Sequence, residues 1–366
     1  MISDLVNDYV KQKKEYKTGL TLDDLCDDYV PADEKRDICK LNENENMFGP
    51  SPKAVEAMGR EAALCNFYPE GSGRKLRNRL AERFGLDPLN YLITDGASIA
   101  LNLIGEVFIR KGDEVIIPKV TYGAYKNVTA RFGGTVVTVP NKDDQSIDLD
   151  GVLNAITGRT KLLFICNPNN PTGGAIPAGQ MKEFLDKVPE NVITVVDEAY
   201  IQYYTSEGGN GVIDYIEEEH CHTIIVRTFS KVYGMAGARI GYAISSQEII
   251  RALRSVANYF CANRVSIAGA VAALGDLEYE KMSIETIVSE RKRVTDELRK
   301  MGYKVYDSEA NFVYVDLGIK PLELCKRLEK FNVYLRGDFE CTRISIGRPE
   351  QNDRMLSVIR KELRGE

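Results

Sequence analysis

Six runs of strand length, each rich in aliphatic and β-branched residues, constrain the fold of this chain more than any other feature. Several of them lack the strict alternation of a strand with one exposed face, as is typical of strands buried on both sides. Helical segments such as AGQMKEFLDKV (178–188) fall between them. This alternation predicts an α/β fold with a mainly parallel mixed sheet flanked by helices. The runs are DEVIIP (113–118), GTVVTVP (134–140), KLLFIC (161–166), VITVVD (192–197), TIIVRT (223–228) and RIGYAIS (239–245).

Changes of pattern along the chain predict three parts. Residues 1–41 are polar and charged, and we expect an N-terminal arm with little core of its own. Residues 42–262 contain the alternating helices and strands of the predicted large domain. Residues 263–366 begin with a long helical pattern that breaks near Gly275 and continue with short strands, which predicts a smaller α+β domain.

Composition excludes several classes of partner. The 366 residues carry a net charge of −6, which gives no general attraction to nucleic acid or anionic membranes. No apolar run approaches the roughly 20 residues that cross a bilayer. Because the N-terminus also lacks the apolar stretch of a signal peptide, we expect a cytoplasmic protein with neither nucleic acid nor membrane as a partner.

Cysteine and histidine usage gives no sign of a disulfide framework or a metal centre. The eight cysteines are scattered, and no CxxC pair occurs, so we expect reduced thiols. His220 and His222 flank Cys221 beside an acidic run. Because no further ligand lies nearby in the sequence, we expect a solvated turn there and no metal.

Chemically distinctive residues follow three of these strands and a further short predicted strand, YLITD (91–95). In parallel α/β sheets, ligands bind beyond the carboxyl ends of the strands. The first of these strand ends leads into a predicted helix, 98–113, which we expect Ser98 to cap and Gly112 to end. The residues at the four ends are Gly96, Ala97 and Ser98 after YLITD, NPNNPTGG after KLLFIC, Asp197 to Tyr200 after VITVV, and Phe229, Ser230 and Lys231 after TIIVRT.

Each of these features has an ordinary structural explanation when taken alone. A helix N-terminus with small residues binds phosphate through its free N–H groups, but such residues also start helices that bind no ligand. Asp197 ends an apolar strand and needs a partner, which a helix cap or an ion pair would supply. Lys231 is either an amine nucleophile with a lowered pKa or a surface lysine. NPNNPTGG by itself is a rigid turn.

Taken together, the four strand ends describe one ligand. A phosphate suits the helix N-terminus, a basic ring nitrogen suits Asp197, and an aldehyde suits Lys231. Asn170 and Tyr200 offer hydrogen bonds to a phenolic oxygen. Pyridoxal 5′-phosphate carries all four groups, and we expect Arg239 to help hold its phosphate.

The ordered motifs NPNNPTG (167–173), DEAY (197–200) and SKVYGMAGARIGY (230–242) also resemble those of a known family. They are similar to the fold-type I, pyridoxal-phosphate-dependent aminotransferases of class I/II, and most like the histidinol-phosphate aminotransferases. The resemblance extends from LNENENMFGPSP (41–52) to RISIGRPEQNDRML (343–356).

The resemblance implies a role for each matching residue. Lys231 would condense with the cofactor aldehyde and then move a proton between substrate and cofactor. Asp197 would keep the ring nitrogen protonated, and Tyr200 would act with it in catalysis by bonding the phenolic oxygen. Tyr122 would stack on the ring. The implied cofactor-binding residues are Gly96, Ala97, Ser98, Tyr122, Asn170, Asp197, Tyr200, Thr228, Ser230, Lys231, Arg239 and Tyr68.

Further residues are implied to act across a dimer or on the substrate. Tyr68 matches a tyrosine that reaches the cofactor of the neighbouring subunit, which predicts a homodimer with shared active sites. The implied substrate-binding residues are Arg343, which would grip an anionic group, Arg336, Asn42 and Tyr29.

The predicted function is the transfer of an amino group, by a ping-pong mechanism, from a donor to a 2-oxo acid such as 2-oxoglutarate. The donor would be histidinol phosphate or an aromatic or related amino acid. An alternative on the same fold is a decarboxylase, cyclase or oxidase acting on a phosphothreonine- or arginine-derived amino acid. An effector-sensing regulator would need a DNA-binding extension, which the sequence does not indicate.

Two places depart from the family pattern. Arg336 and Arg343, which in the family both serve the phosphate of histidinol phosphate, are separated here by only GDFECT. The short loop leaves the phosphorylated donor and the alternative chemistries open. Arg348 stands where many relatives have threonine, and the sequence suggests no role for it.

Overall fold

The computed structural model describes residues 5–6, 9, 11, 20–25, 38–217, 222–260 and 262–365. Tyr29 and His220 therefore lie outside the described residues. The helices are α3 (Leu22–Leu25), α5 (Pro52–Ala62), α6 (Arg74–Phe84), α7 (Ala97–Phe108), α8 (Ala124–Arg131), α9 (Leu149–Asn154), α10 (Ala178–Leu185), α11 (Gln247–Val256), α12 (Arg264–Leu274), α13 (Leu277–Lys300), α14 (Pro321–Glu329) and α15 (Pro349–Arg364). Single 3₁₀ turns cover Pro88–Asn90, Ile201–Tyr203, Thr205–Glu207 and Ile213–Glu217.

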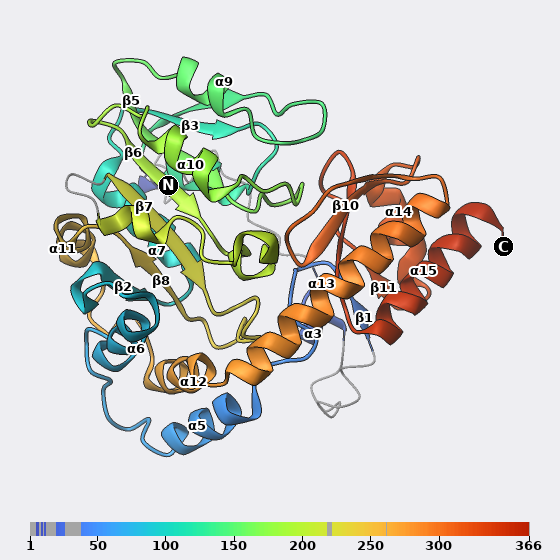
Figure 1. The fold of residues 1–366 in the computed structure, drawn as a ribbon, viewed down its shortest axis with the longest axis horizontal. Helices are drawn as coiled ribbons and strands as arrows, with labels where there is room; N and C mark the ends of the chain where they lie inside the picture. The colour runs from blue at the N-terminus through green and yellow to red at the C-terminus, as the bar shows by residue number, and fades with distance from the viewer. Residues whose placement is uncertain are drawn as a thin grey trace.

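A seven-stranded sheet forms the centre of the molecule, in the order β2-β8-β7-β6-β5-β3-β4 (Figure 1). The four pairings from β7 to β4 are parallel, whereas β8 runs antiparallel to both β7 and β2. The predicted mainly parallel mixed sheet is thus confirmed. Its strands are β2 (Tyr91–Thr94), β3 (Glu114–Pro118), β4 (Thr135–Val139), β5 (Thr160–Cys166), β6 (Ile193–Asp197), β7 (Thr223–Thr228) and β8 (Gly241–Ile244).

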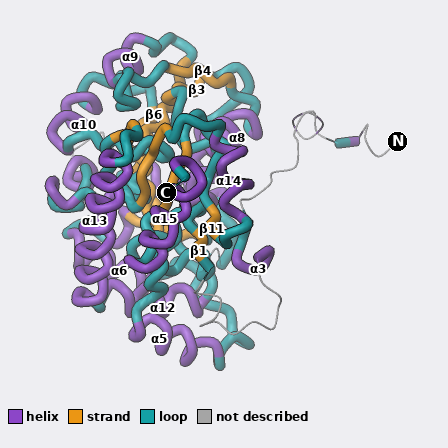
Figure 2. Tube along the Cα trace, turned by 90° about the vertical axis from the view of Figure 1, so that its right-hand side faces the viewer, coloured by secondary structure: helices purple, strands orange, loops and turns teal. Residues whose placement is uncertain are grey.

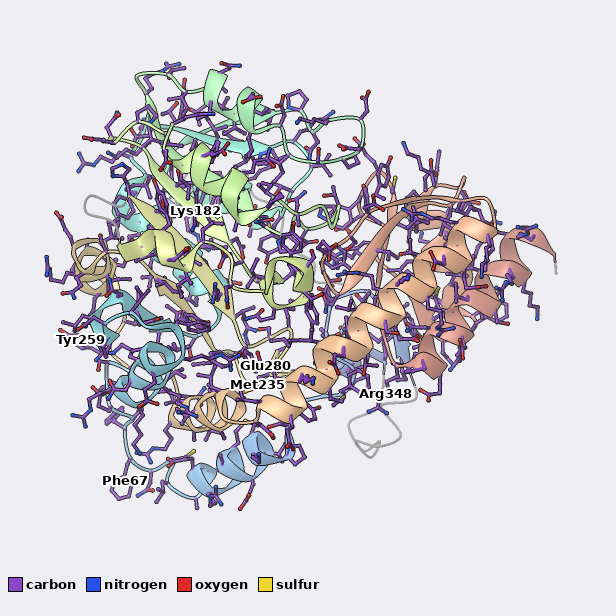
Figure 3. The ribbon with its side chains drawn as sticks, viewed as in Figure 1. Phe67, Lys182, Met235, Tyr259, Glu280 and Arg348 are labelled. Carbon is purple, nitrogen blue, oxygen red and sulfur yellow. The ribbon has the colours of Figure 1, made fainter. Side chains whose placement is uncertain are left out.

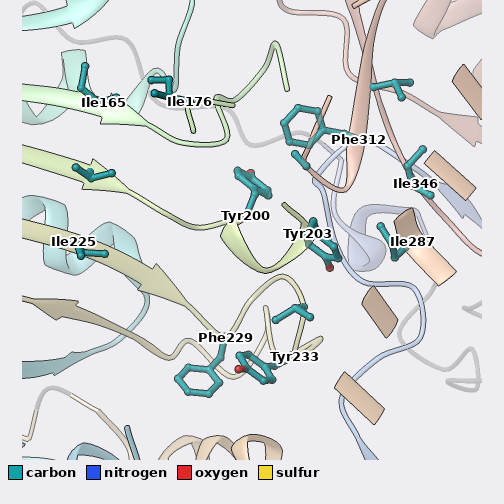
Figure 4. Packing of buried hydrophobic residues seen from close by; sticks show 14 of the residues in the cluster. Ile165, Ile176, Tyr200, Tyr203, Ile225, Phe229, Tyr233, Ile287, Phe312 and Ile346 are labelled. Carbon is teal, nitrogen blue, oxygen red and sulfur yellow. The ribbon is translucent and has the colours of Figure 1, made fainter. Parts of the chain in front are cut away.

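The central strands are buried on both faces, which explains their continuous apolar sequences. Along β5, Leu163 and Ile165 belong to one core cluster, whereas Leu162 and Phe164 belong to the other. Successive side chains of a strand point to opposite faces, so one apolar run supplies both cores. Figure 4 shows Ile165 with other members of the first cluster, which continues to Phe312 in the C-terminal part of the chain.

A second, smaller sheet lies beyond helix α13. Its antiparallel strands β9 (Lys304–Tyr306), β10 (Phe312–Asp316) and β12 (Thr342–Ser345) have the order β12-β10-β9. Helices α13, α14 and α15 pack around this sheet, and α13 continues toward the large sheet, where α12 lies beside α5 (Figures 1 and 2). The predicted break near Gly275 separates α12 from α13. The boundaries 1–41, 42–262 and 263–366 remain a prediction.

A short parallel strand pair joins two segments that are far apart in the sequence. Strand β1 (Cys39–Lys40) pairs with β11 (Val333–Tyr334), and the backbone N–H of Ser345 donates to the carbonyl of Leu41. This pairing places residues 40–45 against the C-terminal sheet. Arg348 also acquires a role, because its Nε donates to the carbonyl of Met47 at 3.0 Å.

Two expectations about local structure were wrong. Helix α7 starts at Ala97 behind Gly96, without capping by Ser98, and it ends at Phe108, before Gly112. The backbone of Gly96, at φ 84°, turns directly from β2 into the helix, so the N-cap falls there. Arg239, expected on a strand, precedes β8 with a left-handed φ of 53°.

None of the described helices is long and apolar enough to cross a membrane. Within the described ranges, no group of three or more His, Cys, Asp or Glu side chains could hold a metal ion.

Candidate active site

A cavity of about 590 Å³ opens at the carboxyl ends of β5, β6 and β7. Its wall also includes the first turn of α7, the segment 40–45 and the turn between Arg336 and Arg343. The seven-stranded sheet, the sheet that contains β12 and the segment 40–45 therefore all contribute. The sequence-predicted residues that line it are Ala97, Ser98, Tyr122, Asn170, Asp197, Tyr200, Thr228, Ser230, Lys231, Arg239, Arg336 and Arg343.

Asp197 ends β6 and presents a buried carboxylate to the cavity. Its Oδ2 accepts a hydrogen bond from the hydroxyl of Tyr125 at 2.8 Å, and its Oδ1 accepts from the N–H of Ala199 at 3.2 Å. Burial raises the pKa of Asp197 to about 6, although these hydrogen bonds and the nearby Lys231 act in the opposite direction. The carboxylate needs a cationic partner in the cavity to stay charged at low cost.

Lys231 follows β7 and brings the amine of the site. Its Nζ donates to the carbonyl of Glu43 at 3.1 Å and lies 5.6 Å from the centroid of the Tyr200 ring. Burial, followed by the positive charge of Arg343, lowers the pKa of Lys231 to about 8. A larger share of neutral amine is therefore available near neutral pH than for an exposed lysine.

Tyr200 is held between the large sheet and the N-terminal segment. Its hydroxyl accepts a hydrogen bond from Nδ2 of Asn44 at 3.1 Å, and its ring packs edge-on against Phe312 (Figure 4). Ser345 in turn donates to Oδ1 of Asn44 at 2.8 Å. These contacts fix the phenol at the cavity wall.

The part of the cavity wall at the start of helix α7 suits an anion. Helix α7 begins with Ala97 and Ser98, and among the described side chains none caps it, so the N–H groups of the first turn face the cavity. The hydroxyl of Thr228 donates to that of Ser230 at 2.8 Å beside it. Arg239 lines the same wall, and a Cβ on Gly96 would stand 2.5 Å from its Nη2.

Arg343 lies on β12, buried between two aromatic rings. Its guanidinium carbon is 5.5 Å from the Phe312 centroid and 5.6 Å from that of Phe339. Nη1 donates to Oδ1 of Asn170 at 2.6 Å, and Nη2 donates to the carbonyl of Asn42. The buried Nε has no hydrogen-bond partner among the described residues, which leaves a donor beside the cavity.

Arg336 faces Arg343 across an antiparallel bridge and is enclosed by acids. Its Nη2 donates to Oδ2 of Asp338 at 2.7 Å, its Nε donates to the other oxygen of the same carboxylate, and Nη1 pairs with Glu43.

Three of the predicted residues that the structure describes do not line the cavity. Gly96 lies just behind Arg239, and Asn42 contributes its carbonyl to Arg343 while its Nδ2 donates to Leu20. Tyr68 is 81% exposed in the single chain and stacks on Phe260. Tyr29 lies outside the described residues.

Sequence reasoning missed Tyr125, Asn44, Glu43 and Asp338. Tyr125 was detectable, because TYGAY places it one helical turn after Tyr122, and the two rings meet edge to face. The other three come from loops that no strand-end rule covers.

Comparison with known proteins agrees with this geometry. A model of the aminotransferase class I and II family matches residues 36–359. An aromatic amino acid aminotransferase of Cutibacterium acnes is 36% identical over 89% of this chain and 93% of its own. A histidinol-phosphate aminotransferase of Moorella thermoacetica is 35% identical over 90% of this chain and 86% of its own. The structure of the Sinorhizobium meliloti histidinol-phosphate aminotransferase with pyridoxal 5′-phosphate has a TM-score of 0.84 and 30% identity, covering 89% of this chain and 91% of that chain.

The donor set of the cavity fits pyridoxal 5′-phosphate. A buried carboxylate suits a ring nitrogen that carries a proton, an amine with a lowered pKa suits an aldehyde, and an uncapped helix start suits a phosphate. Gly96 leaves room where a Cβ would displace Arg239. With a family match that spans most of its length, the chain belongs to the class I and II aminotransferases and uses pyridoxal 5′-phosphate.

Proposed function

We propose that this enzyme moves an amino group between a donor of the histidinol phosphate, aromatic or related amino acid class and a 2-oxo acid such as 2-oxoglutarate. The names of the two relatives above support this donor class. The observation that carries the proposal is the presence of Lys231, Asp197 and Arg343 in one cavity.

The residues proposed to hold the cofactor surround its different groups. Asp197 would pair with the ring nitrogen, and Tyr122 would cover one face of the ring. Asn170 and Tyr200 would bond the phenolic oxygen. The phosphate would lie among Gly96, Ala97, Ser98, Thr228, Ser230 and Arg239.

Pyridoxal 5′-phosphate supplies the electron-accepting ring and the aldehyde that exchange the amino group. The protein's own part is proton transfer and orientation. Lys231, as a free amine, would take a proton from the substrate α-carbon and deliver it to the cofactor. Asp197 would preserve the positive charge that makes the ring an electron acceptor, and Tyr200 would orient the ring by a hydrogen bond.

Arg343 would bind the carboxylate of each substrate in turn, since donor and acceptor share this group. Binding there orients the bond to be broken and restricts the choice of reaction. Because the two substrates would use the same site one after the other, ping-pong kinetics is expected.

The test is covalent mapping. Borohydride treatment of the native holoprotein followed by peptide analysis should attach the cofactor to Lys231. Adding a competent amino donor should convert the visible absorbance of the bound cofactor to that of its amine form, and 2-oxoglutarate should reverse it. Labelling of a different lysine would refute the assignment.

We also propose a homodimer in which Tyr68 reaches the phosphate of the partner subunit's cofactor. Phe67, Tyr68 and Tyr259 are 61%, 81% and 94% exposed in the single chain, an arrangement suited to an interface. Phe67 and Tyr259 lie at the rim of the large sheet's unit in Figure 3. Sedimentation of the wild type should show a dimer. The Tyr68→Phe variant should bind the cofactor more weakly but remain a dimer. A monomer with full activity would contradict both the dimer and the role of Tyr68.

A further inference from the structure

Three cations line the wall that the segment 40–45 and the turn 336–343 form together. Two of them are already neutralised: Lys40 pairs with Glu45, and Arg336 pairs with both Glu43 and Asp338. Among the described residues, no carboxylate lies within ion-pair distance of Arg343. Arg343 is therefore the one cation of this wall that remains without a carboxylate partner among the described residues and can bind the anionic group of a substrate.

The N–H groups of the Arg336 guanidinium already have carboxylate partners. Asp338 accepts from Nε and Nη2 together, the bidentate geometry that makes arginine–carboxylate pairs strong, and Glu43 takes Nη1. The Arg336 side chain is 15% exposed, whereas its partners Glu43 and Asp338 are 34% and 47% exposed. Burial opposes ionisation of Asp338, but the hydrogen bonds from Arg336 lower its pKa below the ordinary value. The three groups together carry a charge of −1.

The short turn holds Asp338 in this position. Backbone hydrogen bonds of 3.1 and 2.9 Å join Arg336 and Arg343 in both directions. Inside the turn, the N–H of Cys341 donates to the hydroxyl of Tyr314 at 3.0 Å. A side chain on Gly337 would collide with the backbone of Pro321 at 2.7 Å, so the turn lies tightly against α14. These contacts fix the backbone of the turn, which places Asp338 two residues after Arg336 and within hydrogen-bond distance of its guanidinium.

Arg343 has the capacity for one carboxylate. A guanidinium has five N–H donors, and Asn170 and the carbonyl of Asn42 each take one. The remaining donors and the single positive charge match a carboxylate of charge −1. A phosphomonoester, with a charge of about −1.5 to −2 near neutral pH, needs a second cation. Here it would meet Glu43 and Asp338 instead.

We propose that Asp338 and Glu43 are specificity-determining residues, which hold Arg336 away from the substrate and restrict the enzyme to amino donors with an α-carboxylate, against donors that carry a phosphate in its place. This inference rests on the proposed function and narrows its donor class. Like-charge contacts that a wrong substrate would have to make are an effective means of discrimination.

The test compares L-histidine with L-histidinol phosphate, which share the amine and the imidazole and differ in the carboxylate or phosphate. The measured quantity is the ratio of kcat/KM for histidine to kcat/KM for histidinol phosphate. We expect wild type to favour histidine by about tenfold or more, and Glu43→Gln/Asp338→Asn to lower the ratio by about tenfold or more. Glu340→Gln removes the same charge from the same turn but does not line the cavity, and it should leave the ratio unchanged.

A binding measurement separates this inference from the proposed function. Calorimetric titration of the holoprotein with histidinol phosphate should show tighter binding to the double variant than to wild type, whether or not turnover occurs. If the double variant does not fold, the single variant Asp338→Asn is used in its place, because it is an isosteric change at an exposed position. A wild type that favours histidinol phosphate, or equal ratios and equal binding in wild type and variant, would overturn the inference. Absence of turnover with the expected binding difference would refute only the proposed function.

Discussion

The hydroxyl of Tyr125 lies 2.8 Å from Oδ2 of Asp197, and both groups are buried. The Tyr125 ring stacks on Phe164 with a centroid distance of 4.6 Å and an interplanar angle of 4°. Packing of α8 on β5 therefore fixes the donor that stabilises the charged form of the carboxylate at the end of β6.

Replacing Tyr125 by Phe should raise the pKa of Asp197 further, because the lost hydrogen bond favours the carboxylate. The acidic limb of the kcat/KM profile should move to higher pH, and the free energy of unfolding should fall by about 1–3 kcal/mol. Tyr203→Phe is the matched control, since the buried Tyr203 hydroxyl has no hydrogen-bond partner among the described residues. An unchanged profile in Tyr125→Phe would show that the bond does not tune Asp197.

Asp197 should make the stability of the cofactor-free protein depend on pH. Its folded-state pKa, about 6, is above the ordinary 3.8, so the folded state binds this proton more tightly than the unfolded chain. Its stabilising contribution is complete below about pH 4 and is lost as pH rises through about 6. Asp197→Asn should therefore raise the free energy of unfolding of the apoprotein at pH 7.5 by about 1–3 kcal/mol, and by less at pH 4.5. Denaturant titration at the two pH values measures this, and an equal change at both would contradict it.

Gly96→Ala should weaken cofactor binding in addition to straining the backbone. Its φ of 84° disfavours any Cβ. The added Cβ would also lie only 2.5 Å from Nη2 of Arg239 and would therefore displace the Arg239 side chain. Gly112→Ala isolates the strain, because Gly112 has a φ of 98° and nothing lies within 4 Å of the added atom. Both apoproteins should lose about 1–3 kcal/mol in stability. Equilibrium dialysis should show lower cofactor affinity for Gly96→Ala alone.

Arg343→Lys should behave as a severe substitution, because an ammonium cannot reproduce the planar fork that meets Asn170, Asn42 and a carboxylate together. We expect kcat/KM for α-amino acid donors to fall by about 30- to 1000-fold, chiefly through KM. Arg348→Lys, outside the cavity, should change neither constant by more than about twofold. Steady-state kinetics with phenylalanine as the donor tests this prediction. A loss confined to kcat would contradict a role of Arg343 in binding the substrate carboxylate in the ground state.

Much of the part of the cavity proposed to hold the cofactor was predictable from the sequence. Apolar runs buried on both faces end in Asp197 and in the residues before Lys231, and parallel strands bring their carboxyl ends to one edge. The helix start at Gly96 joins them because β2 pairs with β8, which pairs with β7. The order of the strands and the residues that follow them therefore predicted most of this part, because ligands bind at the carboxyl ends of parallel strands.

The substrate half was decided by tertiary structure. Arg343 meets Asn170 and the carbonyl of Asn42 only because β1 pairs with β11 and so carries residues 40–45 to the C-terminal sheet. The same pairing gives Glu43 to Arg336, a contact between residues 293 positions apart. No periodicity or motif encodes such a pair.

The sequence by itself thus determined the fold class and the cofactor and placed Lys231 at a strand end, since these follow from local apolar patterns and from residues at the ends of neighbouring strands. Only the tertiary structure decided which charges remain available to a substrate. Whether a buried arginine is neutralised depends on which carboxylate the folded chain brings within reach, because Coulomb interactions depend on distance in space and on the local dielectric, and not on separation along the sequence.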